Sequence, residues 1–224
     1  MNLQGKRVVV TGANGILGHA VVARSQELGA EVIGLDIHFD QAHPWSAQQA
    51  TVDLTDRAAT ERCFATLGRI DVLCNVAGGF AMGETAYEIA SPQWDAMFKI
   101  NVATTQNAIH GAVPIMLAQG RGSIVNIGAM SAREGQANMS AYCAAKSVVM
   151  RLTESLSKEL RTKGINVNAV LPSIIDTPRN RTDMPDADFA KWVRPADLSN
   201  VICFLGSDSA AAIHGALVPV TGLS

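Results

Sequence analysis

The stretch from residue 8 to residue 36, "VVVTGANGILGHAVVARSQELGAEVIGLD", decides the fold. It begins as a run of β-branched residues, turns through Gly12, Gly15 and Gly18, continues with a helical pattern, and ends a second apolar run at Asp36. Glycines at this spacing allow a tight turn and a close approach of backbone N–H groups to a pyrophosphate. Because an acidic residue follows at the end of the next strand, the stretch predicts a dinucleotide-binding βαβ unit.

The rest of the chain repeats this alternation of apolar runs and helical patterns. Runs buried on both faces favour a parallel sheet with right-handed crossovers. We therefore expect an α/β fold, a single Rossmann-type doubly wound domain over residues 1–224, with a seven-stranded, mainly parallel sheet and helices on both faces. The expected strands are 6–12, 30–36, 49–54, 70–78, 122–128, 165–172 and 215–220, and the expected helices are 16–28, 56–67, 92–118, 141–162 and 195–206.

Composition limits the partners that this chain can have. The 224 residues are 48% hydrophobic and 17% charged, with a formal charge of −2, so no nucleic-acid or membrane partner is expected. The amino-terminal residues contain no apolar segment of signal length, and no run is long enough to span a bilayer. The cysteines, Cys63, Cys74, Cys143 and Cys203, lack a metal-binding spacing, which predicts reduced core thiols in a cytoplasmic protein and no metal site.

One polar segment interrupts the alternation of strands and helices. Residues 177–195, "TPRNRTDMPDADFAKWVRP", hold three prolines and many charges. An insertion of this length after a parallel strand favours a substrate lid. The alternative is a solvated surface excursion.

Asp36 indicates the preferred dinucleotide. A carboxylate at this position can accept hydrogen bonds from the adenosine ribose hydroxyls and repels a 2′-phosphate. No Arg or Lys accompanies it in "GLDIHFD" (34–40), so NAD(H) is expected over NADP(H), with His38 as a partial compensation.

Tyr142 and Lys146 indicate proton chemistry. Both lie in a helical pattern four residues apart, so they share one face. A cation near a phenol lowers the pKa of the phenol and favours proton exchange. The alternative is an ordinary tyrosine beside a surface lysine.

These features together resemble the short-chain dehydrogenase/reductase family along the whole chain. The matching pieces are "TGANGILG" (11–18), "VDL" (52–54), "NVAG" (75–78), Asn101, "YCAAK" (142–146) and "LPSIIDTP" (171–178).

The resemblance implies roles for individual residues. Asp53 and Leu54 would lie near the adenine, Lys146 would hold the nicotinamide ribose, Thr177 would contact the carboxamide, and Asn101 would support a proton-relay water. Asn75 and Asn101 could each be only structural hydrogen-bonding residues. The implied catalytic residues are Tyr142, Lys146 and Asn101, and the implied cofactor-binding residues are Gly12, Asn14, Gly15, Ile16, Leu17, Gly18, Asp36, Asp53, Leu54, Asn75, Ala77, Gly78, Tyr142, Lys146, Pro172, Ile175 and Thr177.

The chain departs from the family pattern at position 129. The family's catalytic serine lies thirteen residues before the tyrosine, and this position holds Ala129. Loss of one such oxygen-binding donor typically costs about 10²–10³ in rate. Ser131 is the nearest substitute, two residues out of register, and Gln136, Asn138 and Ser140 are other polar candidates.

Within the family, the chain is most similar to the dihydropteridine reductases. The segment "DTPRNRTDMPDADFAKW" (176–192), the stretch "VAGGFAMG" (76–83) and the alanine at 129 carry this resemblance. It implies an electron-poor conjugated imine substrate, such as a quinonoid dihydropterin, whose reduction develops no localised alkoxide. Phe80 would stack on the flat ring or simply line the pocket, and the tentative substrate residues are Phe80, Ala129 and Ser131.

Three functions remain open from the sequence. The first is NADH-dependent reduction of a conjugated heterocycle with Tyr142 and Lys146 as the proton-donor pair. The second is a ketone or quinone reductase, or alcohol dehydrogenase, with a substitute donor, and the third is a non-catalytic dinucleotide sensor. The expected partners are a small-molecule substrate and further copies of the chain, since the resemblance implies a homo-oligomer (dimer or tetramer) formed through the helices near 92–118 and 141–162.

Overall fold

A parallel sheet of seven strands forms the centre of the molecule. The structure is a computed structural model that describes residues 1–40 and 47–224. The strand order is β3-β2-β1-β4-β5-β6-β7, and every pairing is parallel, so the prediction of a mainly parallel seven-stranded sheet is confirmed. The strands are β1 (Arg7–Thr11), β2 (Glu31–Asp36), β3 (Gln48–Thr51), β4 (Val72–Asn75), β5 (Gly122–Ile127), β6 (Ile165–Pro172) and β7 (Leu217–Val220).

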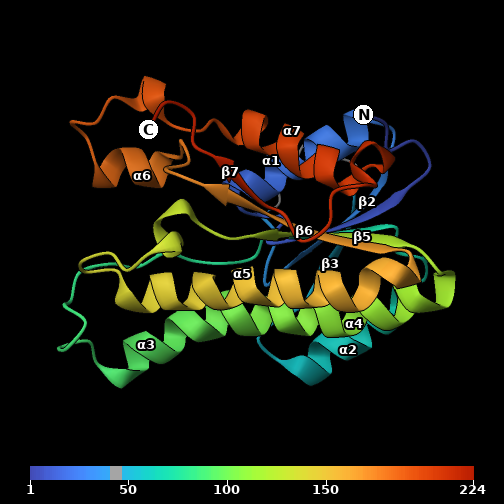
Figure 1. The fold of residues 1–224 in the computed structure, drawn as a ribbon, viewed down its shortest axis with the longest axis horizontal. Helices are drawn as coiled ribbons and strands as arrows, with labels where there is room; N and C mark the ends of the chain where they lie inside the picture. Colours follow the sequence, from blue (N-terminus) through green and yellow to red (C-terminus); the bar gives the residue numbers. More distant parts are fainter. Residues whose placement is uncertain (41–46) are drawn as a thin grey trace.

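Helices cover both faces of this sheet, as the nearly continuous apolar character of its central strands requires. Helices α1 (Ile16–Glu27) and α7 (Pro195–Gly206) lie on one face. Helices α2 (Arg57–Thr66), α4 (Thr104–Gln119) and α5 (Ser140–Leu160) lie on the other (Figure 1). Two shorter helices, α3 (Ser91–Phe98) and α6 (Pro178–Asp183), lie toward one end of the molecule. No helix in the described ranges is long and apolar enough to cross a membrane.

Most predicted strands lose one or more end residues in the structure, and the runs 70–78 and 49–54 differ most from the prediction. The run 70–78 forms a strand only over β4, because Val76 N and Ala77 N donate to the Thr11 hydroxyl (3.0 and 3.1 Å). The run 49–54 forms only the short edge strand β3, which begins at the polar Gln48. In both cases the apolar pattern extends past the last ladder hydrogen bond.

The predicted helix 92–118 is interrupted in the structure. A π-helical turn, Lys99–Ala103, separates α3 from α4 and contains Asn101. Periodicity in sequence cannot reveal such a turn because it adds only one residue to the helical count. The prediction of one uninterrupted helix is therefore wrong at this turn.

The order of the strands fixes where a ligand can bind. The chain builds the sheet outward from β1 through β2 and β3, then returns to place β4 on the other side of β1. In doubly wound sheets, ligands bind at such a switch point, beyond the carboxyl ends of the strands. The residues that follow β1 and β4 are Gly12 and Val76, so the predicted dinucleotide turn lies at this crevice.

Candidate active site

The glycine-rich turn after β1 packs directly against the end of β4. Gly12 has a φ of +65°, and a Cβ there would lie 2.8 Å from both N and Cα of Ala77, so only glycine fits. Gly15 is the N-cap of α1 and, as a glycine, has no side chain to accept a hydrogen bond from the first turn of this helix. The N–H groups of that first turn lack intrahelical partners, which suits a phosphate.

Asp36 lies at the end of β2, beside the same turn. Its Oδ2 accepts a hydrogen bond from Asn14 N (2.8 Å), and its Oδ1 accepts one from Ile37 N (2.7 Å). His38 lies near, with its Nε2 3.2 Å from Asn14 Nδ2. The turn, the open helix terminus and this fixed carboxylate together fit a pyrophosphate and a ribose, and thus a dinucleotide.

Asp53 and Asn75 make local hydrogen bonds. Asp53 Oδ1 accepts from the Thr55 hydroxyl and N–H (2.7 and 2.8 Å), which lowers the pKa of Asp53 and keeps it ionised. Asn75 is buried and donates from Nδ2 to Asn126 Oδ1 (2.8 Å), which joins β4 to β5. Contact of either residue with a cofactor stays a prediction. Asn75 does act as a structural hydrogen-bonding residue, the alternative given for it above.

Asn101 joins the π-helical turn to the loop that follows β4. Its side chain is fully buried, donates to Gly79 O and Met97 O (both 3.0 Å), and accepts from Gly79 N (3.1 Å). Met97 is four residues before Asn101, so the side-chain amide bonds a carbonyl that a regular α-helix would use for its backbone. Asn101 therefore has a clear structural role, and a proton-relay role remains a prediction.

Lys146 reaches from α5 to the carboxyl end of β5. Its buried Nζ donates to Ile127 O (2.9 Å). A Cβ at Gly78 would lie 3.3 Å from this Nζ and 2.8 Å from Asn101 Oδ1. The structure thus brings Gly78, Asn101 and Lys146 together at the switch point, as the sequence predicts.

Tyr142 lies one helical turn before Lys146 and contacts Phe80. The two rings meet edge to face, with centroids 4.9 Å apart and planes at 86°. The tyrosine also packs against a small apolar cluster that contains Ala129. Phe80 remains half exposed, so a flat surface is available beside the phenol.

Burial controls the protonation of the pair. It raises the pKa of the Tyr142 phenol to about 12 and lowers the pKa of the Lys146 ammonium to about 8. The prediction that Lys146 brings the pKa of Tyr142 down toward neutrality is wrong in this structure, because desolvation of the phenolate dominates. At neutral pH Tyr142 carries its proton and Lys146 its charge, which is the state needed for proton donation during a reduction.

Ala129 occupies the position where the family places a serine. It is 3% exposed and directly precedes a 3-10 turn, Met130–Arg133. That turn is held against α5 by two hydrogen bonds, from Cys143 Sγ to Ser131 O (3.3 Å) and from Ser147 Oγ to Ala132 O (2.8 Å). Ser131 therefore belongs to a fixed turn that has left the strand, as the sequence indicates.

The segment after β6 forms a compact excursion with its own helix. It leaves and returns through a bridge between Ile175 and Val193, and Pro172 ends the buried strand before it. Thr177 caps α6 by accepting from Asn180 N (3.2 Å), and Pro178 takes the first helical position. The sequence analysis missed α6, although this threonine–proline pair is a helix-start signal.

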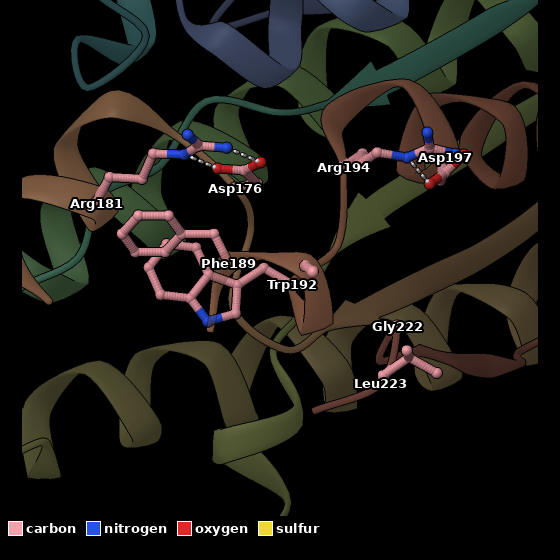
Figure 2. Close-up of a pocket in the computed structure, with 9 residues that line it drawn as sticks. Asp176, Arg181, Phe189, Trp192, Arg194, Asp197, Gly222 and Leu223 are labelled. Atoms are coloured by element: carbon pink, nitrogen blue, oxygen red, sulfur yellow. Dashed lines mark hydrogen bonds and ion pairs between the residues drawn. The ribbon is translucent and has the colours of Figure 1, made fainter. Parts of the chain in front are cut away.

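Charges in this excursion pair with each other. A cavity of about 640 Å³ lies between the excursion, the start of α7 and the chain end near Leu223 (Figure 2). Arg181 makes two hydrogen bonds to Asp176 (2.6 and 2.8 Å) and lies 4.8 Å from the centre of the Phe189 ring. Neither Tyr142 nor Lys146 lines this cavity, so the paired charges stabilise the excursion itself.

Metal ligation has no candidate in the described part of the chain. No group of three or more His, Cys, Asp or Glu side chains there could hold a metal ion.

Comparison with known proteins decides the family. The model of the short chain dehydrogenase family matches residues 6–188. The chain belongs to the short-chain dehydrogenase family. As a short-chain dehydrogenase it is an oxidoreductase, and the crevice with Tyr142, Lys146 and Asn101 is its candidate active site.

Curated relatives of this short-chain dehydrogenase have several different names. A sorbitol dehydrogenase of Cereibacter sphaeroides is 34% identical over 203 residues, covering 86% of this chain and 78% of the relative. A 3-oxoacyl-[acyl-carrier-protein] reductase of Thermotoga maritima is 29% identical and covers 99% of this chain and 98% of the relative. The family is thus shared by proteins named for unlike substrates.

Solved structures share the fold throughout. A putative NAD(P)-dependent gluconate 5-dehydrogenase from Beutenbergia cavernae, with bound NADP, superposes with a TM-score of 0.90 at 29% identity. The match covers 99% of this chain and 97% of that one.

Proposed function

We propose that this short-chain dehydrogenase uses NADH to reduce a flat, conjugated heterocycle of the quinonoid dihydropterin type. The observation that carries the proposal is Ala129, buried beside Tyr142 where an oxygen-binding serine would otherwise lie. A ketone needs a donor there because its reduction develops an alkoxide. A conjugated imine spreads the charge over its ring and needs only the proton.

The cofactor assignment rests on the residues of the switch point. A dinucleotide fits the turn at Gly12 and the open start of α1, as described above. Asp36 favours NADH, since its ionised carboxylate would lie near a 2′-phosphate with no Arg or Lys between residues 34 and 40 to offset the repulsion. The NADP bound to the Beutenbergia cavernae relative supports a nicotinamide dinucleotide as the cofactor. It does not support a preference for NADH over NADPH.

The side chains supply position and a proton. NADH, when held at the switch point, would supply the hydride that the electron-poor ring of the substrate accepts. Tyr142 gives up its hydroxyl proton to a ring nitrogen, where a new N–H bond forms, and a proton from solvent restores the phenol. Lys146 orients the nicotinamide ribose and stabilises the transient phenolate, and Phe80 offers a surface for the ring.

A second candidate is the reduction of a ketone or quinone, or the oxidation of an alcohol. The names of the relatives favour this class, since sorbitol dehydrogenase and L-xylulose reductase denote work on polyols and sugars. In this case water or Ser131 would replace the missing donor. A non-catalytic role is less consistent with the site, because Tyr142, Lys146 and Asn101 are all retained in place.

A reducing compartment suits this chain. All four cysteines are free, and three of them are buried. We place the protein in the cytoplasm on this ground.

The experiment that separates the candidates is NADH oxidation with different acceptors. The purified protein is assayed with NADH and quinonoid dihydropterin, ketones, sugars or quinones, and with NAD⁺ and polyols in the oxidative direction. NADPH replaces NADH in parallel. Turnover of ketones or polyols alone would exclude the first function, and tight NADH binding without any turnover would favour a sensor.

A further inference from the structure

A second cavity, of about 230 Å³, adjoins the Phe80–Tyr142 pair. It lies between the loop that follows β4 and the start of α5. Two of its lining residues are chain neighbours of this pair: Ala81 follows Phe80, and Ala141 precedes Tyr142. No function described above uses this cavity.

The two walls of the cavity are joined before any ligand binds. Asn138 Nδ2 donates to Gly83 O (2.7 Å), and Gly83 N donates to Asn138 O (3.0 Å). Asn138 adopts a φ of +61°, a conformation that asparagine tolerates better than most residues. This pair of hydrogen bonds fixes the width of the cavity.

The lining of the cavity is apolar with a few defined polar groups. Met82, Met97 and Met139 supply adaptable apolar surface. Ser140 also lines the cavity, and its buried hydroxyl oxygen has no hydrogen-bond partner in the described ranges. An unpaired buried hydroxyl is costly unless a ligand completes its hydrogen bond.

Glu84 is the single ionisable residue of this lining. Its Oε1 accepts from Gln93 Nε2 (3.0 Å) and its Oε2 from Ala90 N (3.3 Å), which holds the carboxylate at the cavity. Neither partner carries a positive charge. A carboxylate or phosphate placed here would therefore meet a fixed negative charge without compensation.

We propose that this cavity receives a substituent of the substrate and that Glu84 excludes anionic substituents from it. The inference rests on the proposed function only in placing the reacting ring beside the contacting pair of Phe80 and Tyr142. At about 30 Å³ for each water-sized group, the cavity holds roughly seven such groups. The substituent is thus a short, neutral chain that offers a hydrogen-bond acceptor to Ser140, such as a hydroxyalkyl group.

The test compares neutral and anionic members of matched ligand pairs. Dissociation constants for 6-hydroxymethylpterin and 6-carboxypterin are measured by fluorescence on the complex with NADH, for the wild type, Glu84→Gln and Glu84→Lys. A ketone pair that differs by one carboxylate is measured as a competitor in the same way. Glu88→Gln is the control, because Glu88 lies in the same loop, bonds Thr85, and does not line the cavity.

We expect the wild type to prefer the neutral member, and Glu84→Lys to shift the preference by about tenfold or more toward the anion. Glu84→Gln shifts it less, and Glu88→Gln leaves it unchanged. Ser140→Ala should weaken binding of the hydroxymethyl ligand but not of its 6-methyl analogue, which tests the cavity even if a Glu84 variant fails to fold.

Two results would overturn the inference. One is an equal effect of Glu84→Lys on both members of each pair, and the other is no binding of any member. The turnover assay decides the proposed function separately. A protein that discriminates the ketone pair through Glu84 but does not reduce dihydropterin would retain this cavity and lose that function.

Discussion

At the residue scale, the site is defined by a proton donor that is present and an oxygen-binding donor that is missing. Tyr142 and Lys146 are fixed by the helical spacing of α5, and burial keeps the phenol protonated. Ala129 lies in the cluster against which that phenol packs. Three predictions concern these residues.

Replacement of Tyr142 by phenylalanine tests the donor. The variant keeps the ring and its contact with Phe80 and loses only the hydroxyl. We expect turnover to fall by about 10²–10⁴-fold while the affinity for NADH stays near that of the wild type. Unchanged turnover in a stopped-flow assay of NADH oxidation would remove Tyr142 from the chemistry.

The charge of Lys146 should govern the response to pH. Because burial lowers its pKa to about 8, the ammonium is present below this pH and is lost as the pH rises through it. The affinity for NADH should therefore fall above about pH 8, with one proton involved. Titration of NADH binding between pH 6 and 10 checks this.

The control for that titration is an exposed lysine of the same helix. Lys158→Met should keep the fall in affinity, whereas Lys146→Met should bind NADH weakly at every pH. A wild-type profile that is flat up to pH 10 would contradict the assignment.

Replacement of Ala129 by serine restores the missing hydroxyl. One oxygen-binding donor is typically worth about 10²–10³ in rate, so kcat/KM for simple ketones should rise by some part of this factor. Reduction of dihydropterin should change little. Equal responses of both substrate classes would show that position 129 does not select the substrate.

At the element scale, the π-helical turn shows how a helix is adapted to a site. Its extra residue places Asn101 against the loop after β4, where the amide makes three hydrogen bonds. This turn joins α3 to α4 and packs against the loop after β4, which carries Gly78.

Asn101→Ala should therefore impair both stability and activity. It leaves Gly79 N–H, Gly79 O and Met97 O without their partner, at about 1 kcal/mol for each hydrogen bond. Urea unfolding should show a loss of about 2–4 kcal/mol in the free energy of unfolding. Asn101→Asp keeps the acceptor for Gly79 N and should lose less, and equal losses would show that this acceptor bond does not contribute.

At the scale of the whole molecule, two exposed helix faces predict assembly. Helices α4 and α5 both cover the same face of the sheet (Figure 1), and Leu117 and Val148 are 40% and 39% exposed on them. We propose that these faces meet in a homo-oligomer.

Light scattering with size-exclusion chromatography should give a multiple of the 23.6 kDa chain mass. Leu117→Glu combined with Val148→Glu should shift the protein to the mass of one chain, because the charges would be buried in the interface. Leu223→Glu is the control, as Leu223 is 81% exposed near the chain end. A wild type of 23.6 kDa would contradict the proposal.

Sequence patterns predicted the parallel sheet and the dinucleotide turn because the central strands are apolar over their buried length and Gly12, Gly15 and Gly18 mark the turn after β1. They also placed Tyr142 and Lys146 correctly on one helix face. They could not predict the π-helical turn or the raised pKa of Tyr142. The hydrophobic periodicity of a helix does not reveal one added residue. Desolvation of the Tyr142 phenol depends on residues from distant segments that pack against it, such as Phe80 and Leu171. The cavity beside Glu84 was equally hidden, since the loop after β4, α3 and the start of α5, which are distant in sequence, form it together.

In the excursion between Ile175 and Val193, the charged side chains form ion pairs with one another. Arg181 pairs with Asp176, Arg179 with Asp183, and Lys191 with Asp188. No ion pair in the described ranges joins a residue of 176–192 to the rest of the molecule. Such a segment can be exchanged between related enzymes as a block, because its removal leaves no charge on the scaffold without a counterion. The substrate-lid role predicted for this segment would then make a change of substrate independent of the sheet that carries the chemistry.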